Sequence, residues 1–292
     1  MGKEQEERIG YVTDSVAVGI PPEKIERFDI KTGYLQTIFG DRSSRDRVEL
    51  TLQEFKEKLK GGIHPTSTGV APGDFLEIYR QLAQRCQKIY SIHLPADVSG
   101  TVNSALTAAK YLKEEEPQVD LFVYDSYQAL ASEAFVVEEV AELTTEGANA
   151  QEIEGLIENF HQRCFLIGMG VDLSFIKKSG RVPQAVITII ERATNVLHIT
   201  PAFYVRRLKS RLDIRPLLVR TKQQGFKKII EMSQKEGRPR KLVILHADAP
   251  DKAEQLQREF EKVWDTRFPI CEVPPSIATH TGLGLVGYGQ LR

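Results

Sequence analysis

Short apolar runs rich in branched side chains alternate along the chain with longer segments of helical period. The runs at 9–13, 88–94 and 119–124 have the length and composition of buried strands. The segments at about 101–114 and 127–143 follow two of these runs and carry apolar residues at helical spacing. Strands that alternate with helices in this way predict an α/β fold with a parallel sheet and right-handed crossovers.

The second half of the chain shows a different order of elements. Residues 195–205 and 214–219 have the pattern of two strands joined by a basic loop. A helix near 221–234 and a strand at 241–247 follow them. This order predicts a second α/β domain whose sheet is mixed.

Length and composition agree with this two-domain reading. A chain of 292 residues exceeds the size at which one hydrophobic core usually stops growing. We therefore predict an N-terminal α/β/α domain at residues 1–163 and a C-terminal α/β domain at 164–292. The chain has 41 % hydrophobic and 27 % charged residues, which is typical of a globular protein. Its net charge of -1 provides no global field for nucleic acid, so we expect no nucleic-acid partner.

The cysteines and the apolar segments indicate the expected cellular location of the protein. Cys86, Cys164 and Cys271 are odd in number and far apart, which fits neither a disulfide framework nor a zinc site. A reducing cytoplasm is therefore the expected location. The first ten residues are charged and do not resemble a secretory signal. No later segment has the length of a membrane span, so we expect a protein that does not cross the membrane.

Polar residues collect where the predicted strands end. Asp14-Ser15 and Asp125-Ser126 each follow a strand directly, and residues 95–101 and 65–69 form two further hydroxyl-rich clusters. Any one cluster taken alone is most simply a helix cap. Four clusters at one sheet edge favour a pocket, because ligands of open α/β sheets bind beyond the carboxyl ends of the strands. Hydroxyls and main-chain N–H groups suit a carboxylate or a phosphate, and none of the clusters contains lysine or arginine.

Other chemistries have weaker support. The run at 282–287 matches G-x-G-x-x-G, but only five residues follow it, which leaves no room for the helix and strand of a dinucleotide site. No G-x-S-x-G elbow supports a serine hydrolase, and no histidine pair has metal-ligand spacing. A Ser/His hydrolase and a carrier of another amphiphilic anion stay open as alternatives.

At this point several motifs, in order along the whole chain, resemble the DegV family of fatty-acid-binding proteins. The matching segments are Thr13-Asp14-Ser15, Phe39-Gly40-Asp41, Leu50-Thr51, Glu54-Phe55, Thr66-Ser67, Pro72-Gly73-Asp74-Phe75, Ser99-Gly100-Thr101, Asn103-Ser104-Ala105, Asp125-Ser126, Leu173 to Gly180-Arg181, Arg220-Thr221-Lys222 and His280-Thr281-Gly282 with Gly284.

The resemblance implies a non-enzymatic lipid-binding protein that holds one long-chain fatty acid in a tunnel between its domains. It implies no cofactor other than this ligand, and a partner fatty acid kinase that phosphorylates the carboxylate for phospholipid synthesis. The residues that it assigns to the carboxylate site are Thr66, Ser67, Ser99, Gly100, His280 and Thr281. It places Arg220 at the kinase interface.

The chain departs from the family pattern near this expected site. Pro95 and Ala96 stand where the family usually has two serines, and Leu283 replaces a proline. Thr68-Gly69 replaces the usual Gln-Pro, and alanines occur within 131–134 where the family favours glycines. These departures predict an altered set of carboxylate donors and a narrower or rerouted tunnel.

Overall fold

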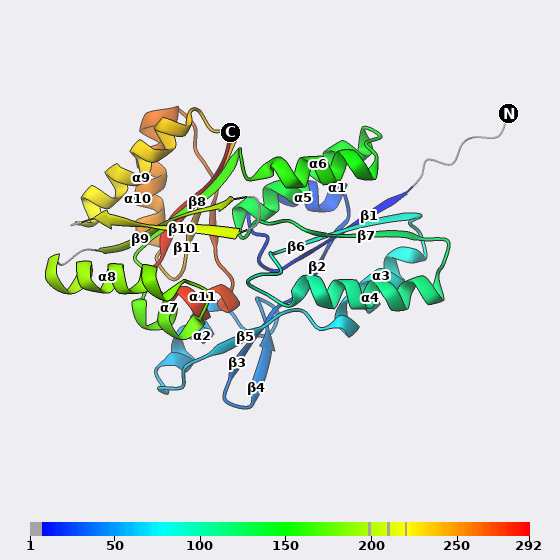
Figure 1. Ribbon diagram of the computed structural model, residues 1–292, viewed down its shortest axis with the longest axis horizontal. Coiled ribbons are helices and arrows are strands. Elements are labelled where there is room, and N and C mark those ends of the chain that lie inside the picture. The colour runs from blue at the N-terminus through cyan, green and yellow to red at the C-terminus, as the bar shows by residue number, and fades with distance from the viewer. Residues whose placement is uncertain (1–7, 198–199, 209–210, 220) are drawn as a thin grey trace.

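The first half of the chain forms a parallel sheet of four strands in the order β2-β1-β6-β7 (Figure 1). The computed structural model describes residues 8–197, 200–208, 211–219 and 221–292. Helices α3 and α4 cover one face of the sheet, and α5 and α6 lie on the other. The elements of this half are β1 (Ile9–Asp14), α1 (Pro22–Arg27), β2 (Ile30–Gly33), β3 (Gln36–Phe39), β4 (Arg42–Arg45), α2 (Leu52–Leu59), β5 (Thr66–Thr68), α3 (Pro72–Ala83), β6 (Lys88–His93), α4 (Thr101–Glu115), β7 (Asp120–Asp125), α5 (Ala131–Thr145) and α6 (Ala150–Phe160).

The second half forms a six-stranded mixed sheet in the order β10-β9-β8-β13-β11-β12. β8 is antiparallel to both of its neighbours, whereas β11 and β12 are parallel. The elements of this half are β8 (Cys164–Met169), α7 (Leu173–Ser179), α8 (Gln184–Leu197), β9 (Thr200–Leu208), β10 (Arg211–Val219), α9 (Lys222–Glu236), β11 (Lys241–His246), α10 (Pro250–Trp264), β12 (Ile270–Glu272), α11 (Pro275–Thr281) and β13 (Val286–Leu291). The predicted fold class, a parallel-sheet half followed by a mixed-sheet half, is confirmed.

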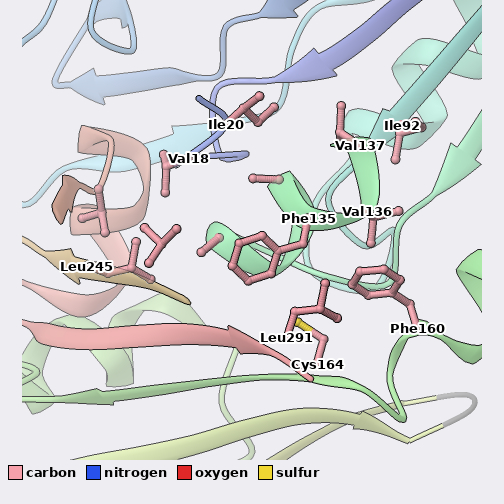
Figure 2. Close-up of a cluster of buried hydrophobic side chains, with 14 of the residues drawn as sticks. Val18, Ile20, Ile92, Phe135, Val136, Val137, Phe160, Cys164, Leu245 and Leu291 are labelled. Atoms are coloured by element: carbon pink, nitrogen blue, oxygen red, sulfur yellow. The ribbon is translucent and has the colours of Figure 1, made fainter. Parts of the chain in front are cut away.

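Helix α5 joins the two halves into one packed unit. It contacts β6 of the first sheet and β8, β11 and β13 of the second. Figure 2 shows Phe135 and Val136 of α5 beside Phe160, Cys164 and Leu291. Because side chains from both halves share this core, the predicted division at residue 163 stays a prediction. The last strand of the first sheet ends at Asp125 and the second sheet begins at Cys164.

Buried ion pairs tie α5 to both halves. The carboxylate of Glu138, 3 % exposed, lies 2.6 Å from the Lys24 Nζ of α1 and 2.8 Å from the Lys241 Nζ of β11. Glu139 pairs with Arg163 and Arg240. A buried carboxylate needs such partners, because an unpaired charge in the protein interior is strongly destabilising. The position of α5 between the sheets is therefore closely specified.

A three-stranded antiparallel sheet, β4-β3-β5, was missing from the sequence prediction. Its strands have only three or four residues each and lack an apolar run, so their pattern gives no strand signal. Within this sheet β5 pairs with β3 and packs against α11 of the second half. This small sheet therefore places the segment 65–69 next to α11, at the candidate site described below.

The predicted strand at 195–205 is wrong in its first part. Helix α8 continues to Leu197, and β9 begins at Thr200. The buried Ile187 and Ile190 are three residues apart, so the apolar pattern of this segment has helical period. The expected basic loop is also shorter, because both strands of the β9–β10 hairpin extend into it. Among the described residues, no helix is long and apolar enough to cross a membrane.

Candidate functional site

Two of the four predicted hydroxyl clusters, those at 65–69 and 95–101, line a cavity of about 620 Å³ between the two halves of the molecule, named the polar cavity here. This volume lies in the usual range of small-molecule sites. Ser67, Ser99, Gly100, His280 and Thr281 all line it, which brings together five of the six residues expected to bind a carboxylate. They come from β5, the loop before α4, and α11. Segments more than 200 residues apart in the sequence therefore share one wall.

Ser67 and His280 form a direct pair on this wall. The Ser67 Oγ lies 2.8 Å from the His280 Nε2, and the His280 Nδ1 is buried without a hydrogen-bond partner among the described residues. Burial, together with the nearby Arg181 guanidinium and His64 imidazole, lowers the pKa of His280 to about 4. The imidazole is therefore neutral at pH 7, so it acts here through hydrogen bonds and brings no positive charge.

The start of α4 supplies the second hydroxyl group. The Ser99 Oγ accepts a hydrogen bond from the Thr101 N–H at 3.2 Å and lies 2.9 Å from the Thr101 Oγ1. The backbone of Gly69 packs against this pair so closely that a Cβ at residue 69 would lie 2.7 Å from the Thr101 Oγ1. Glycine at position 69 therefore leaves space for the hydroxyl groups of Thr101 and Ser99, which a larger side chain would meet.

Position 96, where the sequence lacks the expected serine, is fixed by its backbone instead. The Ala96 N–H donates to the Asp125 Oδ2 at 2.9 Å, and the preceding Leu94 N–H donates to the Asp14 Oδ2 at 3.0 Å. Both carboxylates come from the polar clusters at the strand ends. They hold the loop that leads to Ser99, so these two clusters shape the cavity and do not line it.

Arg181 is the site residue that the sequence analysis missed. Its Nε donates to the Val98 O at 2.7 Å and its guanidinium to the Ser179 O at 2.9 Å, so it bridges the two halves. Arg181 lines the polar cavity and is solvent-exposed. The resemblance included this arginine as the end of a motif, but only the fold places it beside the hydroxyl clusters. It supplies the positive charge that the clusters lack.

The other expected site residues have different positions. Thr66 is exposed on β5 and does not line the cavity, whereas the neighbouring Ser67 does. The hydroxyl of Thr281 already donates to main-chain carbonyls of Ile277 and Gly282. Arg220, the expected kinase-contacting residue, lies outside the described residues.

A second, apolar cavity of about 210 Å³, named the apolar chamber here, adjoins the polar cavity. All of its lining residues except Leu130 belong to the second half, and most of them are aliphatic or aromatic. Its lining residues are Leu130, Leu166, Ile167, Gly168, Val171, Ile176, Ser179, Arg181, Val182, Phe203, Val205, Ile214, Leu245, His280, Thr281, Leu285 and Gly287. Gly287 of β13 contributes to this wall: a Cβ at Gly287 would lie 2.0 Å from the Ile167 O, so only glycine lets β13 approach β8.

The fold and the two cavities define an α/β protein whose two sheets enclose a site with one polar and one apolar end. The chain belongs to the DegV family, because the sequence model of the uncharacterised proteins of this family matches residues 8–292. The predicted family membership is confirmed.

Relatives of known sequence cover nearly the whole chain. A DegV domain-containing protein of Halalkalibacterium halodurans is 29 % identical, over 96 % of this chain and 97 % of that protein. Protein DegV of Bacillus subtilis is 27 % identical, with the same coverage of both chains.

Solved structures share the fold. A DegV family protein from Thermus thermophilus, described by its fatty acid binding, has a TM-score of 0.81 at 24 % identity and covers 97 % of this chain and 99 % of its own. A stearic-acid-binding protein from Eubacterium ventriosum has a TM-score of 0.83 at 17 % identity, with 98 % of both chains covered.

Proposed function

We propose that this protein binds one long-chain fatty acid, with the carboxylate in the polar cavity and the tail in the apolar chamber. The observation that carries this proposal is the junction of the two cavities, which share part of their lining. One end offers hydroxyls, a neutral imidazole and a guanidinium, whereas the other offers almost only carbon. A ligand that fills both must be an amphiphile with an anionic head.

The polar end suits a single carboxylate. In the tautomer with the proton on Nε2, His280 donates to the Ser67 Oγ, and the Ser67 hydroxyl proton can then point to a bound oxygen. Ser99 and the exposed start of α4 at Gly100 provide further donors. Arg181 contributes one positive charge against the one negative charge of a fatty acid. A polyphosphate would lack enough positive partners here.

The family relatives support a fatty acid as the ligand. The Thermus thermophilus and Eubacterium ventriosum proteins are described as binding a fatty acid, and stearic acid in the second case. Burial of a chain of about sixteen carbons favours binding by roughly 10 kcal/mol, at about 0.8 kcal/mol for each methylene before the costs of association. Few polar contacts are then needed for tight binding.

Native mass spectrometry of the purified protein, followed by organic extraction, tests this function. We expect one fatty acid per chain, or uptake of added octadecanoic acid by empty protein. The variant Val182→Trp fills the apolar chamber and is expected to lose the ligand while it keeps its circular dichroism spectrum. Protein that is empty and takes up no fatty acid would refute the proposal.

We further propose that the protein is a carrier that presents the carboxylate to a partner fatty acid kinase and performs no chemistry itself. The exposure of Gly100 and Arg181 at the polar cavity supports this orientation, because the head group then lies at the accessible end. With a purified fatty acid kinase and ATP, Arg220→Ala should leave fatty acid affinity unchanged and slow acyl phosphate formation. Equal rates for both proteins would exclude Arg220 from the kinase interface.

A further inference from the structure

Six residues line both the polar cavity and the apolar chamber, and the junction that they surround is named the passage here. Three of these residues are polar and three are apolar: Arg181, His280, Thr281, Leu130, Leu166 and Val205. The apolar three come from different elements, namely the residue before α5, the middle of β8 and β9. A ligand that occupies both cavities has to pass between these side chains.

Leu130 has an unusual backbone at this passage. Its φ of 55° and ψ of -132° lie in a region that glycine adopts readily and other residues rarely do. A glycine would fit this position without backbone strain. Residues in such conformations persist where the surrounding structure fixes them, and they are concentrated at functional sites. The leucine therefore keeps a side chain at this point in spite of an unfavourable backbone.

Helix α5 holds Leu130 in this position. The first residue of the helix, Ala131, packs so closely on β13 that a Cβ at Gly289 would lie 2.8 Å from the Ala131 Cβ. One to two turns later, Glu138 is held by Lys24 and Lys241 from opposite halves of the molecule. Because the helix is fixed at both points, the Leu130 backbone has little room to relax and its side chain stays in the passage.

We propose that the side chain of Leu130 sets the width of this passage and so determines which acyl tails enter the apolar chamber. It admits an unbranched chain and excludes a chain that carries a methyl branch at the depth of the passage. Removal of one or two methyl-sized groups from an apolar pocket changes discrimination by about tenfold or more. This inference rests on the proposed binding of a fatty acid.

A series of octadecanoic acids with one methyl branch, moved carbon by carbon along the chain, tests the proposal. With the parent protein, we expect affinity to fall at least about tenfold for branches at one or two adjacent positions, relative to unbranched octadecanoic acid. Leu130→Ala should restore the affinity for those acids to within about threefold of the unbranched acid. Leu130→Gly should do the same and unfold at a higher temperature than Leu130→Ala, because both variants lack the leucine side chain and only glycine relieves the backbone strain.

Two control variants each enlarge one of the cavities at a residue outside the passage. Val98→Ala changes only the polar cavity and Val182→Ala only the apolar chamber. Both variants should therefore show the lowest affinity for acids branched at the same position as in the parent protein. A minimum that persists in both Leu130 variants, or no minimum in the parent protein, would overturn the role of Leu130. A parent protein that binds no acid of the series, the unbranched one included, would overturn the proposed function together with this inference.

Discussion

The described part of the chain contains two hydrogen-bonded serine–histidine pairs, which differ in burial and in their other partners. Ser67 and His280 line the polar cavity, with 2.8 Å between the Oγ and the Nε2. Ser91 and His93 lie inside the parallel sheet on β6, with 2.6 Å between the same two atoms. The Ser91–His93 pair, called the inner pair here, is completely buried, and neither residue lines the polar cavity or the apolar chamber.

The partners of the two histidines also differ. The His93 Nδ1 lies 3.4 Å from the Asp14 Oδ2 but makes no hydrogen bond among the described residues, and Ser91 receives a further contact from the Tyr79 hydroxyl at 2.7 Å. The inner pair therefore has the serine, histidine and carboxylate of a hydrolase but no access for a substrate. The Ser67–His280 pair, called the outer pair here, is accessible to a ligand in the polar cavity. The described residues, however, place no acid at the His280 Nδ1.

This difference shows why residue types alone do not identify a catalytic serine. A nucleophile needs a base that is itself oriented by a third group, and it needs substrate within reach. Neither pair meets both requirements. The inner pair has a carboxylate near its histidine but no hydrogen bond to it and no access for a substrate, and the outer pair has access but no hydrogen-bond partner at the His280 Nδ1 among the described residues. The arrangement favours a structural role for the inner pair and ligand binding for the outer pair, which weakens the alternative of a Ser/His hydrolase.

Removal of the inner histidine should have the largest effect on stability. His93→Ala leaves a cavity and removes a hydrogen-bond partner from the buried Ser91 beside Tyr79. We expect a loss of about 3–5 kcal/mol in the free energy of unfolding. Urea denaturation followed by circular dichroism measures this change. His280→Ala serves as the matched variant and should cost less, since His280 is only partly buried; a larger loss for His280→Ala would reverse our assignment of the two pairs.

The free energy of unfolding should decrease in acid because of His280, the histidine of the outer pair. The folded protein holds the pKa of His280 at about 4, below its ordinary value of 6.5, so the unfolded chain binds a proton first as the pH falls. The stability linked to this group is complete above pH 6.5 and decreases as the pH falls to 4, by on the order of 3 kcal/mol. Urea midpoints measured from pH 7 to pH 4 check this slope. His280→Gln should flatten it, and an unchanged slope in that variant would assign the acid sensitivity to other groups.

The sequence predicted the parts of the fold that depend on local pattern. The buried strands at the centre of the first sheet were found because their branched residues form short continuous runs. Helix α8 was not predicted, and its last residues were assigned to the strand at 195–205, since an apolar segment next to a strand continues helical spacing without a break. The burial of Glu138 and Glu139 in α5 was also missed, because partners such as Lys241 and Arg240 lie about 100 residues further along the chain.

The candidate site was predictable in composition but not in detail. The hydroxyl cluster before α4 follows the end of β6, where ligands of parallel sheets bind, so its place at the site followed from the order of elements. The cluster at 65–69 reaches the same cavity on the small antiparallel sheet, which the sequence pattern did not indicate. Arg181 could not be found in this way, since it reaches the cavity only through a contact with the Val98 O, 83 residues earlier in the chain. The difference between Thr66 and Ser67 depends on the twist and packing of a three-residue strand, which the sequence pattern does not indicate.

The smallest expected effect concerns these two neighbours and decides how far the outer pair contributes to binding. Ser67→Ala removes the hydroxyl paired with His280, and we expect fatty acid affinity to fall about tenfold, or about 1.4 kcal/mol, with little change in stability. Thr66→Ala is the matched control on the same strand, and its exposed position predicts a smaller loss. Isothermal titration with octadecanoic acid compares the two variants. A larger loss for Thr66→Ala would mean that the ligand carboxylate lies outside the polar cavity and that the Ser67–His280 pair, like the inner pair, mainly supports the fold.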